Sequence, residues 1–196
     1  MPKLGMEKIR RQQLIEATLA SIEQHGLHGT TIVTISKLAG VSTGIISHYF
    51  NGKAGLIEAT VKYLLQQLKV DLLAALEQKL SHHARLHAII DANFSSLQQS
   101  HQAAVTWLAF WAQSMHSPEL ARLQRVNAAR LESNLKYSLK HTVKEDQVGW
   151  CAKMLAAQID GVWLRAALSQ DINAYAQGVE TCKRLIDKVV NDYPIR

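Results

Sequence analysis

The chain of 196 residues carries a formal net charge of +6 at pH 7 and a sequence pI of about 9.4, and 47% of its residues are hydrophobic. This composition excludes a disordered chain, and the length allows a sizeable buried core. The positive charge favours an anionic partner such as nucleic acid. No apolar run is long enough to span a membrane, and the basic N-terminal residues precede no apolar stretch of the signal-peptide kind. We therefore expect a cytoplasmic protein in which Cys151 and Cys182 are buried, reduced thiols.

Glycine placement separates the first quarter of the chain from the rest. Six of the ten glycines lie in residues 26–55, which predicts short elements there and long helices afterwards. No segment alternates apolar and polar residues in the way a strand does. The sequence therefore predicts an all-α fold of about nine helices. A three-helix domain over residues 1–53 is joined by a long helix to a second helical domain over residues 54–196.

Apolar residues at helical spacing predict the helices in chain order. Gly26 is the expected end of the first helix, Thr30 or Thr31 the cap of the second, and Ser42 or Thr43 the cap of the third. The fourth helix, with its repeated leucines, is expected to be roughly 40 Å long at 1.5 Å per residue. The expected helices span about residues 8–25, 32–39, 44–50, 54–80, 83–100, 102–115, 118–140, 145–168 and 174–191.

Two short helices joined by a tight glycine turn form the pattern of a helix-turn-helix. Gly40 lies in the turn, where a positive φ is expected. Ile46 follows Val41 by five residues, where the second helix must pack on the first. The expected core positions of the motif are Ile35, Leu38, Ala39, Val41, Ile46 and Phe50.

Residues 30–60, TTIVTISKLAGVSTGIISHYFNGKAGLIEAT, resemble the DNA-binding domain of the tetracycline-repressor family of bacterial regulators. The shared features are the threonine pair, AGVS at the turn, the glycine that opens the second short helix, HYF near its end, and a lysine followed by Gly-Leu. Ser36 departs from the family, which usually has alanine there, but its hydroxyl can bond back to a helical carbonyl. The resemblance implies a regulator that binds palindromic double-stranded operator DNA, that is not an enzyme, and that needs no cofactor and no metal.

Residues 38–52, where DNA contact is expected, include no formally charged side chain when histidine is counted as neutral. Backbone N–H groups at helix starts and hydroxyls, such as those of Thr31 and Ser42, can hold phosphates instead. Arg10 and Arg11 are expected to add salt-dependent charge at the rim. The predicted DNA-binding residues are Thr31, Ser42 and Gly44 near phosphates, Thr43, Ile45, Ser47 and His48 at base edges, and Lys37, Tyr49 and Lys53 along the DNA backbone.

Tryptophans at helical spacing in the second domain suggest a ligand. Trp107, Phe110 and Trp111 share one helix face, and Trp163 follows Asp160 by three residues. Aromatic faces together with a buried carboxylate hold a quaternary ammonium group by cation–π attraction and charge pairing. Ordinary core packing, with Asp160 bonded to a neighbouring helix, is the alternative.

The segments WLAFWAQSMHSPEL and AQIDGVWLRAAL resemble choline-responsive members of the same family, and the likeness covers nearly the whole chain. It implies repression of the genes for choline uptake and for choline oxidation to glycine betaine, relieved by choline. The resemblance and the aromatic spacing give Trp107, Trp111, Asp160 and Trp163 as ligand-binding residues. A repressor of this family that senses a lipid, a drug or another cation stays open.

The two C-terminal helices are apolar enough to bury a face against a second subunit, and Gly161 would let helices approach closely. In this family the last two helices form the dimer interface, so the resemblance implies a homodimer. Two DNA-binding domains about 34–36 Å apart can read a palindrome. Ligand binding would favour a dimer whose DNA-binding domains are wrongly spaced for the operator. The fourth helix would connect the ligand site to the DNA-binding domain.

Two other classes of function fit parts of the sequence. His83 and His87 lie four residues apart and can form a metal pair, but no acidic third ligand lies at metalloprotease spacing. Solvated histidines at a helix start explain them more simply. An architectural DNA-binding protein without an inducer has no need of the large non-basic second domain. The sequence therefore favours a ligand-responsive repressor.

Overall fold

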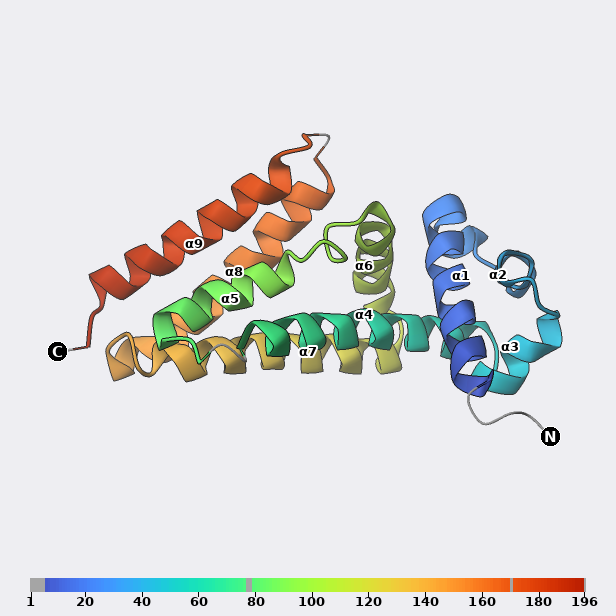
Figure 1. Cartoon of the computed structure of the whole chain (residues 1–196), viewed down its shortest axis with the longest axis horizontal. Helices are drawn as coiled ribbons and strands as arrows, with labels where there is room; N and C mark the ends of the chain where they lie inside the picture. Colours follow the sequence, from blue (N-terminus) through green and yellow to red (C-terminus); the bar gives the residue numbers. More distant parts are fainter. Residues whose placement is uncertain (1–5, 77–78, 170, 196) are drawn as a thin grey trace. The chain divides into compact units, whose positions relative to one another are not determined.

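The computed structural model describes residues 6–76, 79–169 and 171–195 (Figure 1). This part of the chain is all-helical, as predicted, apart from one isolated antiparallel bridge between Val143 and Pro194. None of its helices combines the length and hydropathy needed to cross a lipid bilayer. The elements are α1 (Met6–Gly29), α2 (Ile32–Ala39), α3 (Thr43–Phe50), α4 (Lys53–Leu76), α5 (His82–Asn93), α6 (His101–Ser114), α7 (Pro118–Leu139), the short 3-10 helix η1 (Glu145–Gln147), α8 (Val148–Ala167) and α9 (Ala174–Asp192).

The chain folds into two compact units, each built from separate stretches of sequence. The first unit holds the residues up to Gln66 together with Ser100–Gln124. The second holds Gln67–Gln99 and the residues from Arg125 onward. The helices α4 and α7 therefore each contribute residues to both units, and α4 is the long connecting helix that the sequence predicts.

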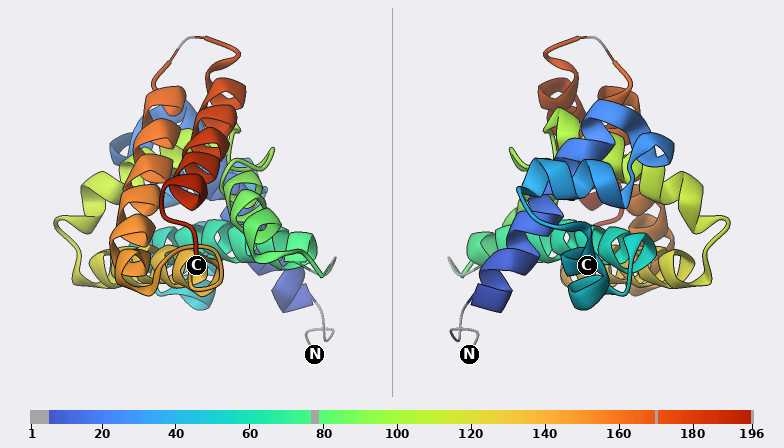
Figure 2. Two further views of the ribbon diagram at one scale, coloured as in Figure 1. Left: turned by 90° about the vertical axis from the view of Figure 1, so that its left-hand side faces the viewer. Right: turned by 90° about the vertical axis from the view of Figure 1, so that its right-hand side faces the viewer.

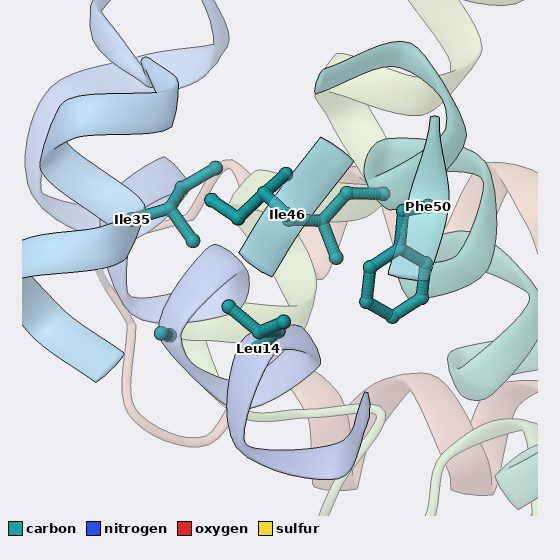
Figure 3. Close-up of a cluster of buried hydrophobic side chains, with 6 residues drawn as sticks. Leu14, Ile35, Ile46 and Phe50 are labelled. Carbon is teal, nitrogen blue, oxygen red and sulfur yellow. The ribbon is translucent and has the colours of Figure 1, made fainter. Parts of the chain in front are cut away.

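A cluster of buried side chains forms the core of the first three helices. Leu14 from α1, Ile35 from α2 and Ile46 from α3 are inaccessible to solvent, and Phe50 and Leu56 complete the cluster. Figure 3 shows Leu14, Ile35, Ile46 and Phe50 gathered between the three helices. The right-hand view of Figure 2 shows the same three helices packed as one group. The predicted core positions Ile35, Ile46 and Phe50 are confirmed.

Local chemistry sets the start of α2 and the turn after it. The Thr31 hydroxyl accepts a hydrogen bond from the Thr34 N–H at 3.1 Å, and the Thr34 hydroxyl accepts one from the Thr31 N–H at 2.8 Å. This reciprocal cap satisfies two donors that a helix start would otherwise leave free. Gly40 has φ 64°, the left-handed value expected at the turn. The Ser36 hydroxyl donates to the Ile32 carbonyl at 2.6 Å, as predicted.

Two expectations for the first three helices need correction. Gly26 interrupts α1 with φ 65°, but a helical turn resumes as far as Gly29, so α1 is kinked there and does not end. Leu38 is 42% exposed and is not a core residue. The buried face of α2 follows Ile35 and, one turn later, the partly buried Ala39, which leaves Leu38 beside that face.

Three later helix ends also differ from the prediction. α4 ends at Leu76, while residues 77 and 78 of the predicted helix lie outside the described residues. α5 ends at Asn93, and the next residue, Phe94, leaves the helical conformation with φ −116° and ψ 31°. Phe94 is 3% exposed, and its ring centroid lies 6.4 Å from that of Tyr175. α8 begins at Val148, preceded by the separate turn η1.

In the second unit, α8 and α9 pack against each other (Figure 2, left). A close approach occurs at Gly178 of α9, where a β-carbon would lie 2.6 Å from Cγ1 of Val162 on α8. Gly161 does not serve this purpose within the chain, because its β-carbon position has no neighbour within 4 Å. Cys151 and Cys182 are buried free thiols, as predicted, and burial raises the pKa of Cys182 to about 11.

Candidate DNA-binding surface and ligand residues

The predicted DNA-binding residues lie on α2, on α3 and at their ends, and none of them is buried. Their availability follows from the core, because burying Ile35 and Ile46 turns the opposite faces of both helices to solvent. Seven are exposed, namely Thr31, Lys37, Ser42, Thr43, Gly44, Ser47 and His48, and three are half-buried, namely Ile45, Tyr49 and Lys53.

The starts of the two short helices differ chemically. At α2, the Thr31 hydroxyl is engaged by its own helix. At α3, the Ser42 hydroxyl makes no capping hydrogen bond, although the Ser42 carbonyl accepts one from the Ile45 N–H at 3.2 Å. The exposed hydroxyls of Ser42 and Thr43 therefore stand at the positive end of the α3 dipole, an arrangement suited to a phosphate without any charged side chain.

A cation from α1 stands beside the last turn of α3. The guanidinium carbon of Arg11 lies 5.5 Å from the ring centroid of Tyr49 and 5.0 Å from that of Phe50. Its Nε donates to Glu7 at 2.9 Å. The Tyr49 ring also contacts the imidazole of His48, with 4.9 Å between centroids. These contacts hold the Arg11 charge beside the end of α3, and its role at the rim of a DNA-binding surface stays a prediction.

Two predicted contact residues are partly committed to the fold. Ile45 packs against the core formed by α1, α2 and α3, so it does not face fully outward as expected. The Lys53 Nζ donates to the Leu27 carbonyl at 3.2 Å. This bond ties the start of α4 to the turn that follows the α1 kink, so Lys53 also has a structural role that the sequence did not reveal.

The aromatic face predicted on α6 belongs to the first unit. Trp107 is 5% exposed, and its ring centroid lies 5.6 Å from that of Phe110 and 6.3 Å from that of Trp111. The three side chains thus share one face, as expected. Trp107 is largely a core residue, whereas Trp111 is half-buried and more accessible.

Asp160 and Trp163 belong to the second unit, on α8. Trp163 is 6% exposed, and its Nε1 donates to the Gln98 carbonyl at 3.2 Å. Asp160 is exposed, which corrects the expectation of a buried carboxylate. Neighbouring protein atoms still exclude part of the water around its carboxyl group, and this desolvation raises the pKa of Asp160 to about 6. A nearby cation would therefore stabilise the ionised form.

Tyr175 on α9 is a neighbour of Trp163 that the sequence did not indicate. Its ring centroid lies 6.3 Å from that of Trp163 and 6.4 Å from that of Phe94. Its hydroxyl is buried without a hydrogen-bond partner among the described residues, and burial raises its pKa. Such a hydroxyl costs free energy unless a ligand or water satisfies it. No local spacing signals this cluster, because α5, α8 and α9 bring its members together.

A groove of about 570 Å³ lies in the first unit, beside the start of α4 and the turn from α6 to α7. Its walls include Lys53 and Glu119 but none of the four predicted ligand residues. The Ser117 hydroxyl caps α7 here, accepting from the Leu120 N–H at 3.3 Å and donating to Glu119 at 3.0 Å. Hydrogen bonds from the Glu119 backbone and from Ser117 lower the pKa of Glu119. The predicted start of α7 is confirmed.

Two family models match the chain. Residues 82–191 match the C-terminal part of BetI-type transcriptional repressors, and residues 14–60 match bacterial regulatory proteins of the tetR family. The HTH-type transcriptional regulator BetI of Vibrio campbellii is 48% identical over 195 residues, which cover 98% of this chain and 94% of the relative. The regulator of the same name from Pectobacterium carotovorum is 54% identical over 175 residues, covering 87% and 89%.

A solved structure shows the same fold. A proposed transcriptional regulator from Saccharomonospora viridis, solved in complex with choline, matches 95% of this chain and 98% of its own with a TM-score of 0.81, at 16% identity. The likeness in fold and the identity to the two BetI regulators extend over both units of the structure. The chain belongs to the BetI-type transcriptional repressors of the TetR family.

Proposed function

We propose that this repressor binds a palindromic operator that controls genes for choline uptake and for choline oxidation to glycine betaine, and that choline relieves the repression. The observation that carries the proposal is the similarity to BetI regulators over nearly the whole chain. The choline-bound relative in fold supports the choice of ligand. A repressor that responds to a different small molecule is the alternative.

DNA recognition is proposed to use uncharged groups that contact base edges and a few cations that contact phosphates. The exposed Ser47 and His48 would meet base edges, while Lys37 would contact a phosphate. Loss of His48 is then expected to weaken binding to the operator more than binding to unrelated DNA. Loss of Lys37 is expected to weaken both alike and to reduce the slope of affinity against salt by about one.

Choline is proposed to be held by aromatic faces and a carboxylate. Trp163 and the adjacent Tyr175 offer rings, and Asp160 offers a negative charge one helical turn from Trp163. The buried Tyr175 hydroxyl lacks a partner among the described residues and suits the hydroxyl of choline. Trp107 and Trp111 in the first unit remain proposed ligand residues.

Dimer formation is proposed through α8 and α9. On α8, a stripe of small and apolar residues is not buried within the chain: Ala157, Gly161, Leu164 and Leu168. Their spacing of three and four residues places them on one side of the helix. The open space at the Gly161 β-carbon position leaves room for a helix of a second copy. Such a face loses its contact with water when two subunits associate.

The coupling is proposed to run through α4, which begins directly after the DNA-binding helices and continues into the second unit. Choline would bind more tightly to a dimer whose DNA-binding domains are wrongly spaced for the operator. A tenfold loss of operator affinity needs a coupling free energy of only about 1.4 kcal/mol. If the two domains kept the same spacing with and without choline, this mechanism would be wrong.

Calorimetric titration with choline tests the ligand, with glycine betaine and the neutral isostere dimethylbutanol as controls. We expect saturable binding of choline and none of the isostere, because only choline carries a charge for the rings and Asp160. Asp160→Asn is expected to weaken choline binding at least tenfold, while Asp146→Asn, at an exposed aspartate of η1, leaves it unchanged. Operator affinity is then measured by fluorescence anisotropy with and without choline. Choline that binds without lowering operator affinity would refute the proposed relief of repression.

A further inference from the structure

Two histidines and an aspartate meet between α5 and α9 in the second unit. Nε2 of His83 and Nε2 of His87 lie 2.9 and 2.8 Å from the same Oδ1 atom of Asp187. One ligand atom from each of the three residues lies within 4.8 Å of the other two. We propose that this histidine–aspartate cluster (His83, His87 and Asp187) binds a zinc ion, or a similar divalent transition metal, and thereby links α5 to α9.

The side chains converge because of their positions on two neighbouring helices. His83 and His87 are separated by one turn of α5, so both imidazoles extend from the same face, and their ring centroids lie 4.8 Å apart. Asp187 faces them from α9. The sequence showed the histidine pair but no third ligand, because Asp187 lies 100 residues after His87. The fold supplies the acidic group that the pair lacked.

The distances are close to those of a coordination site. Zinc binds imidazole nitrogen and carboxylate oxygen at about 2.0–2.2 Å in a tetrahedron, which separates the ligand atoms by roughly 3.3–3.5 Å. The observed separations of 2.8 and 2.9 Å must therefore widen by about half an ångström. Half-exposed side chains can make such a shift by rotation. Coordination requires the Nε2 lone pair, so each metal-bound imidazole would carry its proton on Nδ1.

A second ion pair joins the two helices that hold the cluster. One helical turn away, Lys183 of α9 pairs with Asp91 of α5 at 2.6 Å, which fixes the register of the two helices. Beneath the cluster, Leu86 and Ile186 are both inaccessible to solvent. The three ligands are thus held near each other before a metal arrives, which lowers the entropic cost of binding.

The cluster is open to solvent on one side. The side chains of His83, His87 and Asp187 are 43%, 28% and 46% exposed, so an ion can enter and water can fill the fourth position. Two imidazoles with one carboxylate favour zinc and related transition metals. Magnesium and calcium prefer ligand sets made of oxygen atoms and are not expected to bind here.

Calorimetric titration of the full-length protein, prepared without a polyhistidine tag, tests the site with Zn²⁺ and with Mg²⁺ as the control ion. We expect one zinc per chain and no binding of magnesium. His87→Gln and Asp187→Asn should each weaken zinc binding at least tenfold. His116→Gln, at an exposed histidine outside the cluster, should leave it unchanged. Absence of zinc binding, or equal affinity in wild type and Asp187→Asn, would overturn the proposal.

Circular dichroism first verifies that each variant keeps its helical content. Zinc should raise the thermal unfolding temperature of the wild type and not that of Asp187→Asn, because only the intact site bridges two helices. If a variant loses its helices, X-ray absorption at the zinc edge of the wild-type protein decides instead. Two imidazole ligands per zinc are expected there, and fewer than two would refute the site.

Discussion

Replacing Ile46 by alanine tests the assignment of the DNA-binding core. Ile46 is inaccessible to solvent at the centre of the cluster formed by α1, α2 and α3. The substitution removes three carbon atoms. At about 0.8 kcal/mol for each buried carbon, the lost transfer free energy is about 2.4 kcal/mol. The cavity left behind adds to this, so we expect a total loss of about 3 kcal/mol, within the range for buried isoleucine.

Leu38→Ala is the matched control, because it removes the same number of carbon atoms from the same motif. Leu38 is apolar and was expected in the core, but it is 42% exposed. Truncating a partly exposed side chain forfeits less transfer free energy and leaves no enclosed cavity, so we expect a loss below about 1 kcal/mol. If the observed packing is right, only Ile46→Ala is strongly destabilising. If both residues were in the core, as their hydrophobicity alone predicts, the two variants would be destabilised alike.

Amide hydrogen exchange over residues 43–50, followed by mass spectrometry, measures the local stability of α3. A loss of about 3 kcal/mol corresponds to exchange roughly 150-fold faster in Ile46→Ala. Leu38→Ala should accelerate exchange less than about fivefold. Peptides from α8 and α9 serve as an internal reference and should exchange at the wild-type rate in both variants. Equal acceleration by the two substitutions would refute the assignment of Leu38 to the surface.

Three further changes test other parts of the molecule. Gly55→Ala should abolish operator binding and leave choline binding intact, because the added β-carbon would overlap the Phe50 carbonyl at the end of α3. Fluorescence anisotropy measures operator binding, and calorimetry measures choline binding. Asp160→Asn should unfold at a higher temperature than the wild type at pH 7. The folded state raises the Asp160 pKa from 3.8 to about 6, so the stability of the wild type falls as pH rises through that range. Below pH 3.8 the wild type and Asp160→Asn should unfold at the same temperature. Leu164→Glu should shift the protein from dimer to monomer in analytical ultracentrifugation, since it puts a charge into the apolar stripe of α8, and an unchanged dimer would exclude that stripe from the interface.

The DNA-binding helices could be predicted closely because local signals determine them. The cap at Thr31 and the left-handed Gly40 depend on residues only a few positions away. Leu38 shows the limit of this approach. Its residue type indicates burial, but the buried face of α2 is set by how α2 docks on α1 and α3, which is a tertiary effect.

The second unit was less predictable because its key contacts join distant segments. Helical periodicity continues past Asn93, yet α5 stops there and the next residue, Phe94, packs near Tyr175 of α9. Asp160 was expected to be a buried carboxylate near Trp163, but it is exposed within the single chain. Similarly, the pairing of His87 with Asp187 bridges 100 residues. Such contacts depend on the register of α5, α8 and α9, which residue spacing within one helix does not contain.

The neutral stretch that is proposed to face DNA and the positive charge of the chain would serve different purposes. A cation binds phosphates of any sequence, whereas a hydroxyl or an imidazole at a base edge distinguishes one base pair from another. In this structure Arg11 is held beside the last turn of α3 by Glu7 and by the rings of Tyr49 and Phe50, whereas Thr43, Ser47 and His48 are exposed. Discrimination by one such short helix is small, because it reaches few base pairs. In the proposed dimer, two copies on a palindrome would double that discrimination, and the operator affinity would then depend on the spacing that the ligand is proposed to change.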